Sequence, residues 1–494
     1  MKKIIIALLG IAMLVSCEDF LSKLPDNRTN LDSPSAIQEL LVSAYPEGCF
    51  QSFTEVMSDN AGDKGQGRYV VEFLPNEYAY YWKDDSSDDY DTPTDYWNYC
   101  YQAIAAANQA LDAIKKNGDG PEYASAKGEA LAARAYSHFM LANIFGKQYN
   151  PTTAATDLAV PFVDEPEDVV FKSYVRTTVD DVYKRVEADL LQAEKLITDD
   201  TYKVPRYHFT TDALNAFFSR IYLYKADWNK VISYSSKVLG ANPAEKIRDW
   251  NGKYINLEFR ELWAQYSKSE EPANILLMRG YTAWASGCIV LRYSLAPNKV
   301  KELFQMEYGN PFELIIGDRI TYAASDQQMA FVPKYPDRVE SVAGIGRGGY
   351  PNTIIPIFTT AELLFNRAEA YVMQGEYDKA LADINSYLTK TAKDYRAITE
   401  DDIIDIYTAE PGPDIAAFYP INERQKFFIW SILDLRRKEF VHEGLRWFDV
   451  KRFDIEVVHN VFDGADIKLP KGDPRRVVQI PSQAVATGLE PNPR

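Results

Sequence analysis

The chain of 494 residues is 46% hydrophobic and 25% charged, which is the composition of a globular protein with a large buried core. Its formal net charge of −17 excludes nucleic acid and anionic lipid surfaces as partners, because both require clustered Lys and Arg side chains. The cysteines beyond Cys17 lack metal-ligand spacing, so Cys49, Cys100 and Cys288 leave open either one disulfide or buried free thiols.

The first residues are typical of an exported lipoprotein. A positively charged start is followed by an apolar run from Ile4 to Val15, which is shorter than the roughly 20 residues of a membrane-spanning helix. Cys17 stands where this run ends, as in a lipobox, in which the cysteine is acylated and becomes the new N-terminus. The alternative is an ordinary cleaved signal with a chance cysteine. We predict a signal peptide over residues 1–16 and a lipid on Cys17.

Residues 17–33 are expected to form the lipidated N-terminus and a tether, because Pro25, Asn27 and Asn30 are typical of a loop. The body is expected over residues 34–494. No other segment approaches the length of a transmembrane helix, so we predict that the lipid alone holds the chain on the membrane.

Helical periodicity dominates residues 96–240 and returns at about 359–391, which indicates helix pairs packed side by side. Thr178 and Asp181 predict a capping box, and a later helix is expected from Trp228 to Leu239, before Gly240. The apolar faces of the first two helices are predicted to contain Trp97, Tyr101, Ile104, Asn108 and Leu111, then Leu131, Ala135, His138, Ala142 and Phe145.

The clearest repeat runs from Thr359 to Leu388. Thr359 and Glu362 predict a capping box, and Gly375, Tyr377 and Ala380 reproduce the G-x-Y-x-x-A turn of a tetratricopeptide unit. We therefore predict a mostly α fold of tetratricopeptide-like helical repeats.

Two long segments without helical period, residues 49–95 and 251–356, are expected to be irregular insertions that bind the ligand. Both are rich in aromatic residues, on which the C–H faces of sugars stack while polar side chains bond the hydroxyls. The alternative is that these aromatics pack the insertions onto the helices. The candidate binding residues are Tyr80, Tyr81, Trp82, Tyr281, Trp284, Asp59, Asp63 and Arg68, with Asn60 beside them.

Motifs of catalysis and cofactor binding are absent or unspecific. Gly344, Gly346 and Gly349 satisfy G-x-G-x-x-G, but no convincing strand precedes them and Pro351 follows at once, so a loop is expected. The acidic run 84–91 lacks the glycine and terminal Glu of an EF-hand and is expected to be a solvated loop. No paired carboxylates of a glycosidase can be singled out. We predict no catalytic residue, no metal and no cofactor.

Several segments together resemble the SusD/RagB lipoproteins of Bacteroidetes over nearly the whole mature chain. The matching segments are Cys17 with Asp19-Phe20-Leu21 and Pro25, Trp97 to Leu111, Gly128 to Gly146, Glu362 to Leu388, Arg437 to Asp449, and Ile480-Pro481 with Asn492-Pro493. The insertions and residues 479–494 depart from the family pattern, which leaves the ligand open.

The resemblance implies a SusD-like helical body at the cell surface of the outer membrane. It also implies that the chain binds oligosaccharides, or alternatively peptides as in RagB, without catalysis and delivers them to a SusC-like TonB-dependent transporter. A surface glycosidase and a pure interaction scaffold remain alternatives. Five residues match a family segment but are expected to be structural, on an amphipathic helix with paired charges: Arg437, Glu439, Glu443, Arg446 and Trp447.

Overall fold

The computed structural model describes residues 31–167, 172–304, 310–324, 328–336, 338–341 and 349–494. The expected signal peptide, Cys17 and most of the tether lie outside the described residues. The first described helix is α3 (Pro34–Leu41), and the hydroxyl of Ser33 caps it by accepting a hydrogen bond from the N–H of Ala36. None of the described helices is long and apolar enough to cross a membrane.

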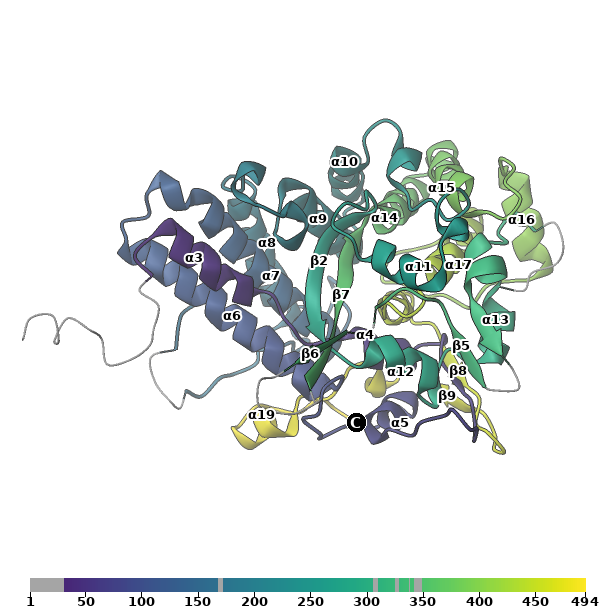
Figure 1. The fold of residues 1–494 in the computed structure, drawn as a ribbon, viewed down its shortest axis with the longest axis horizontal. Helices are drawn as coiled ribbons and strands as arrows, with labels where there is room; N and C mark the ends of the chain where they lie inside the picture. Colours follow the sequence, from purple (N-terminus) through teal and green to yellow (C-terminus); the bar gives the residue numbers. More distant parts are fainter. Residues whose placement is uncertain (1–30, 168–171, 305–309, 325–327, 337, 342–348) are drawn as a thin grey trace, which may run out of the picture.

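Long antiparallel helices form one half of the molecule, on the left of Figure 1. There α6 (Pro93–Lys116) packs on α7 (Ala124–Phe145), and α7 packs on α8 (Val179–Ala193). Because α7 lies between two helices, it is buried on nearly all sides, as its alanine-rich sequence permits.

The second helical array lies at the upper right of Figure 1 and brings together distant parts of the chain. Here α9 (Thr211–Lys225) packs on α10 (Trp228–Leu239), α10 on α14 (Thr360–Met373), and α14 on both α15 (Tyr377–Thr391) and α17 (Glu423–Glu439). The prediction of a mostly α fold built from helix pairs is confirmed.

The predicted helix caps are only half formed. Thr178 and Thr359 accept hydrogen bonds from the N–H groups three residues later, as expected. The partner carboxylates do not bond back to the cap. Glu362 instead forms an ion pair with Arg220 at 2.6 Å, because an unpaired guanidinium in this buried position is costly.

The segment 251–356 contains a three-stranded antiparallel sheet of order β2-β7-β6, which joins the two helical halves. β2 (Asn274–Tyr281) pairs with β7 (Gly349–Thr359), and β6 (Arg338–Ser341) pairs with the start of β7. The two-stranded pairs are β1 (Gly62–Asp63) with β3 (Tyr293–Ser294), β4 (Tyr322–Ala324) with β5 (Met329–Phe331), and β8 (Val457–His459) with β9 (Ile467–Leu469).

Short helices also occupy the two segments that were expected to be irregular, which corrects that expectation. Their seven or eight residues are too few to produce a recognisable helical period. These helices are α4 (Gln51–Met57), α5 (Leu74–Tyr80), α11 (Phe259–Tyr266), α12 (Trp284–Val290) and α13 (Pro297–Phe304). The C-terminal part adds α16 (Glu400–Ala409), α18 (Arg446–Arg452) and α19 (Ser482–Ala486).

The described end of the glycine-rich motif, Gly349, belongs to a strand and not to a helix N-terminus. A strand, β6, does precede it, contrary to the sequence expectation, and Gly349 begins the strand β7. Gly344 and Gly346 lie outside the described residues. Since a strand and not a helix follows, the described part of the motif lacks the helix N-terminus that a pyrophosphate requires.

Where the chain is described, its cysteines form no disulfide and its side chains form no metal-binding cluster. Cys49, Cys100 and Cys288 are buried and form no disulfide, which decides between the two alternatives left open by the sequence. Among the described residues, no group of three His, Cys, Asp or Glu side chains is arranged to hold a metal ion.

Candidate functional site

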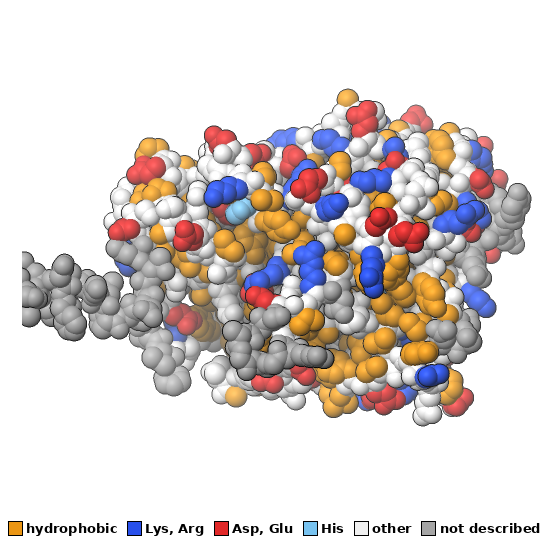
Figure 2. All heavy atoms as spheres, in the orientation of Figure 1, with side chains coloured by type: hydrophobic (Ala, Val, Ile, Leu, Met, Phe, Trp, Pro, Cys, Tyr) orange, Lys and Arg blue, Asp and Glu red, His pale blue; other side chains and the backbone are white. Residues whose placement is uncertain are grey.

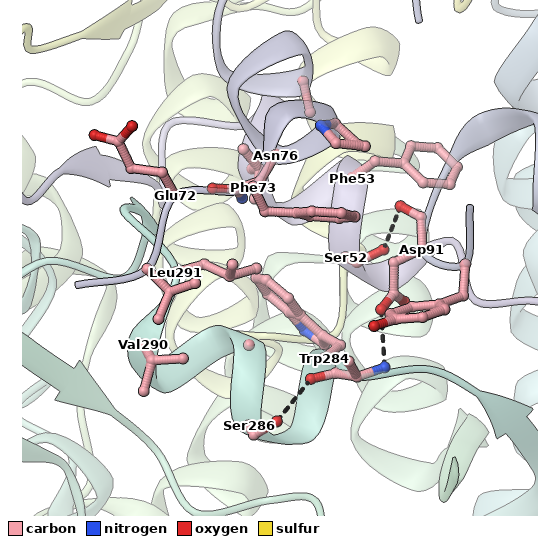
Figure 3. Close-up of a pocket in the computed structure, with 17 residues that line it drawn as sticks. Ser52, Phe53, Glu72, Phe73, Asn76, Asp91, Trp284, Ser286, Val290 and Leu291 are labelled. Atoms are coloured by element: carbon pink, nitrogen blue, oxygen red, sulfur yellow. Dashed lines mark hydrogen bonds between the residues drawn. The ribbon is translucent and has the colours of Figure 1, made fainter. Parts of the chain in front are cut away.

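A pocket of about 240 Å³ opens between the two segments predicted to bind ligand (Figure 3). One wall comes from α4, α5 and the residues that precede α6, and the other comes from α12. In the close-up, Phe73 and Trp284 lie on opposite sides of the cavity. Apolar side chains gather on the face of the molecule over α12, at the lower right of Figure 2.

Local sequence explains both walls of the pocket. Pro75 stands in the first turn of α5, where its fixed φ favours helix initiation and directs the extended Phe73 toward the cavity. Trp284 and Gly287 lie on α12, and Leu291 directly follows its last residue. The three are spaced three and four residues apart and therefore share one face. All three line the pocket, and Gly287 leaves room between its two larger neighbours.

Asp91 clamps the two walls together. One of its carboxylate oxygens accepts a hydrogen bond from the hydroxyl of Thr282, and the other accepts one from the N–H of Ala283 at 2.9 Å. The same hydroxyl accepts a bond from the N–H of Trp284, which fixes the first turn of α12. Burial raises the pKa of Asp91 to about 6. Asp91 also has a φ of 64°, a left-handed conformation that costs energy in a residue other than glycine.

A second set of contacts ties the pocket to the C-terminal part of the chain. The indole N–H of Trp284 donates to the carbonyl oxygen of His442 at 2.9 Å. The backbone N–H groups of His442 and Gly444 donate to the carboxylate of Glu55 on α4, at 2.8 and 3.0 Å. Burial raises the pKa of Glu55 to about 7. The side chains of Trp284 and Glu55 therefore attach both walls to residues 442–444, which are far away in the sequence.

The polar groups inside the pocket are already hydrogen-bonded to the protein. The side chain of Asn76 exchanges two hydrogen bonds with the backbone of Tyr293. Ser52 donates to the carbonyl oxygen of Asp91, and Ser286 donates to that of Ala283. At the mouth, Glu72 forms an ion pair with Arg292 at 3.0 Å. Among the described lining residues, neither serine has a His, Cys or Lys beside it.

Most of the aromatic residues predicted to bind ligand pack inside the protein. Trp82 is 3% exposed, stacks on His459, and donates its indole N–H to the carbonyl oxygen of Met57. Tyr80 is fully buried and also stacks on His459, with the two ring centroids 4.1 Å apart. Tyr81 is half-buried and contacts Tyr80 edge-on. These positions agree with the packing alternative for this group.

The charged candidates are distributed between structural ion pairs and the surface. Asp59 receives two hydrogen bonds from Arg446, at 2.8 and 2.9 Å. Burial favours a raised pKa at Asp59, but Arg437 and Arg446 outweigh it and hold this pKa well below its usual range. Asp63 is bound by Arg292 in the same bidentate way. Arg68 is exposed and lies over the ring of a neighbouring tyrosine.

The predicted residues are therefore not gathered into one site. Trp284 lines the pocket, whereas the hydroxyl of half-buried Tyr281 donates to Glu340 on β6 and its ring lies beside Arg279. Sequence reasoning missed the aromatic residues that form the rest of the pocket. The signal for Phe73 was the largely apolar stretch from Val70 to Pro75, which is interrupted by Glu72. Phe53, Phe73 and Tyr90 are the pocket aromatics that were missed.

The charged C-terminal segment is structural, as predicted, but it is buried and not a solvated helix face. Glu443 forms an ion pair with the buried Lys334 at 2.7 Å, and Glu439 accepts hydrogen bonds from Trp250 and Tyr387. Because these charges are desolvated, each forms an ion pair or hydrogen bonds within the core. Trp447 is likewise buried.

Two family profiles match the chain and together span most of it. Residues 19–223 match a SusD-like family described as starch-binding and associating with the outer membrane. Residues 298–478 match the SusD/RagB profile, described as the SusD family. No curated protein matches the chain in sequence.

Solved structures share the fold at low sequence identity. A SusD superfamily protein from Bacteroides thetaiotaomicron has a TM-score of 0.67 at 18% identity, covering 94% of this chain and 100% of its own. A SusD-like carbohydrate binding protein from Bacteroides vulgatus has a TM-score of 0.64 at 16% identity, covering 92% and 96%. A SusD-like protein from Bacteroides fragilis has a TM-score of 0.57 at 15% identity, covering 94% and 98%. With both profiles matched in order along this shared fold, the chain belongs to the SusD/RagB family.

Proposed function

We propose that this protein is a cell-surface lipoprotein that binds oligosaccharides without cleaving them and delivers them to a SusC-like TonB-dependent transporter. The observation that carries the binding role is the preformed pocket between residues 49–95 and 251–356, whose walls are clamped by Asp91 and Glu55. Preformed concave sites of this kind are typical of small-ligand binding. The description of the matched family as starch-binding and the name of the Bacteroides vulgatus relative support a carbohydrate as the ligand.

The position of the tether supports delivery to a transporter. Asn117, at the C-terminal end of α6, donates a hydrogen bond to the carbonyl oxygen of Leu31, whereas Asp91 lies just before the other end of α6. The 24 residues of α6 make it about 36 Å long. The predicted tether therefore leaves the body about one helix length from the pocket. A body attached at that point can swing so that the pocket approaches or leaves a neighbouring protein.

Attachment to the membrane keeps the protein and its bound ligand close to such a transporter. A lipid on Cys17 confines the protein to the membrane surface and raises the effective concentration of bound ligand over the transporter. The 14 residues from Cys17 to Asn30 can span at most about 50 Å, which exceeds the length of α6. The tether therefore permits the body to move as a lid while the lipid stays in place.

Two measurements test this function. Mild detergent extraction with a C-terminal affinity tag, from cells grown on the inducing glycan, should recover a TonB-dependent transporter with this protein. Incubation of the mature chain carrying Cys17→Ala with oligosaccharides should show binding by calorimetry and unchanged ligand by chromatography. Repeated recovery without a transporter contradicts the delivery role, and progressive shortening of the ligand contradicts the non-catalytic role.

A further inference from the structure

The polar side chains inside the pocket bond to the protein itself. The amide of Asn76 makes two hydrogen bonds with the backbone of Tyr293, and the hydroxyls of Ser52 and Ser286 donate to backbone carbonyls. Both oxygens of Asp91 are occupied by donors from the segment before α12. The remaining lining is mostly aromatic and aliphatic, with Phe73 and Trp284 facing each other (Figure 3).

The pocket has the size and character of a site for one apolar group. An apolar protein cavity of about 150 Å³ is large enough to bind benzene. This pocket holds about 240 Å³, which admits one aromatic ring or a branched acyl chain of similar size. A ring placed between Phe73 and Trp284 would have aromatic surfaces on both sides.

An unsubstituted sugar ring does not suit this interior. Its hydroxyl groups point outward around the whole ring and would meet side chains and carbonyls that are already paired. Each polar group buried without a partner weakens binding by about five- to a hundredfold. A sugar ring is better placed at the mouth, where Tyr90 is 42% exposed and stacks beside Phe73.

The backbone beside the pocket does not suit an extended peptide. Peptides often bind by adding a strand to an unpaired sheet edge. Here the N–H of Val71 donates to Val290, and the N–H of Arg292 donates to Val71, so the two chain segments at the mouth already pair with each other. Both polar backbone groups of Val71 are therefore already used within the protein.

The charge at the mouth excludes an acidic ligand group. Glu72 is exposed there, and among the described lining residues Glu72 and Asp91 carry the charged side chains. The guanidinium of nearby Arg292 is shared between Glu72 and Asp63. A carboxylate or sulfate would therefore be repelled, whereas a neutral group would not.

We propose that the pocket binds one neutral aryl or branched acyl substituent carried by the captured glycan, while the sugar rings remain at the mouth against Tyr90. This inference rests on the proposed function and names the ligand feature that the site selects. The pocket recognises the substituent, and the glycan chain lies outside the cavity.

The test compares phenyl and methyl α-glucosides by ligand-observed saturation-transfer NMR and calorimetry. The protein is the mature chain with Cys17→Ala, so that no detergent competes for the phenyl group. We expect the phenyl glycoside to bind about ten- to a hundredfold more tightly, as burial of one aromatic group implies. Val71→Trp fills the mouth from a position that is 48% exposed and should abolish this preference. Val339→Trp, a matched change at a 59% exposed position on β6, should preserve it.

Circular dichroism verifies that each variant folds. If Val71→Trp does not fold, Ala79→Leu replaces it, because this side chain extends into the same pocket from α5. Equal affinity for the two glycosides overturns the inference, as does a phenyl preference that persists when the mouth is filled. If either of these results is obtained and unsubstituted maltooligosaccharides nevertheless bind, the proposed function stands and only the inference fails. If no glycan binds and peptides with aromatic side chains do, both fail.

Discussion

Glu55 provides a quantitative test of how the burial of a carboxylate affects the stability of this fold. Its carboxylate is 2% exposed and accepts hydrogen bonds from the N–H groups of His442 and Gly444 and from the amide of Asn60. Burial raises its pKa from 4.5 to about 7, because these donors and the distant Lys334 do not fully replace the lost water. The substitution Glu55→Gln keeps the shape of the side chain and removes its titration.

The direction of the pH effect follows from the raised pKa. The folded protein binds the proton of Glu55 more tightly than the unfolded chain, whose pKa stays near 4.5. Protonation of Glu55 therefore stabilises the fold fully below pH 4.5, and this contribution is lost as the pH rises through about 7. Since one pKa unit corresponds to about 1.4 kcal/mol, the contribution amounts to about 3 kcal/mol.

Urea unfolding followed by tryptophan fluorescence, at intervals between pH 4.5 and 8, measures this contribution. Other groups titrate in the same range, so the informative quantity is the difference between wild type and Glu55→Gln. We expect the free energy of unfolding of the wild type to fall by about 3 kcal/mol more than that of the variant across this range. Glu39→Gln, at an exposed position, should follow the wild type. Parallel curves for wild type and Glu55→Gln would refute the reasoning.

Three further predictions concern anchoring, core electrostatics and packing. Cys17→Ala should move the protein to the aqueous phase in detergent partitioning, and retention in the detergent phase would contradict lipid attachment. Glu362→Gln should lower the free energy of unfolding by about 3–5 kcal/mol, because it leaves Arg220 buried without a counter-ion. Glu400→Gln, which breaks an exposed ion pair, should cost at most about 1 kcal/mol in the same urea titration. Trp82→Phe should leave glycan affinity unchanged in calorimetry, since the indole packs on protein; a tenfold loss would show that it contacts ligand.

Local signals in the sequence were sufficient to predict where the long helices begin and end. The helix predicted from Trp228 to Leu239 has those bounds, because Asp227 caps its first turn and Gly240 adopts a φ of 68° after its last. Thr178 and Thr359 likewise begin helices at the expected positions. Each of these features depends on residues within one or two turns of one another.

Predictions failed where the outcome depended on distant partners. Glu362 was expected to complete a capping box, but Arg220, far away in the sequence, pairs with it in the core. The strands β2 and β7 are buried along most of their length, so they lack the alternation of polar and apolar residues that would have revealed a sheet. Short helices such as α4 and α5 are stabilised by their neighbours and carry little period of their own.

The sequence by itself determined the helical body and the resemblance to SusD-like lipoproteins, because periodicity, caps and short motifs are properties of neighbouring residues. Only the tertiary structure decided which aromatic side chains face a cavity. Trp82 and Trp284 occur in similar aromatic stretches, yet His459 covers the first, whereas the second forms a wall of the pocket opposite Phe73. Exposure depends on which remote segments pack against a side chain, and no local pattern contains that information.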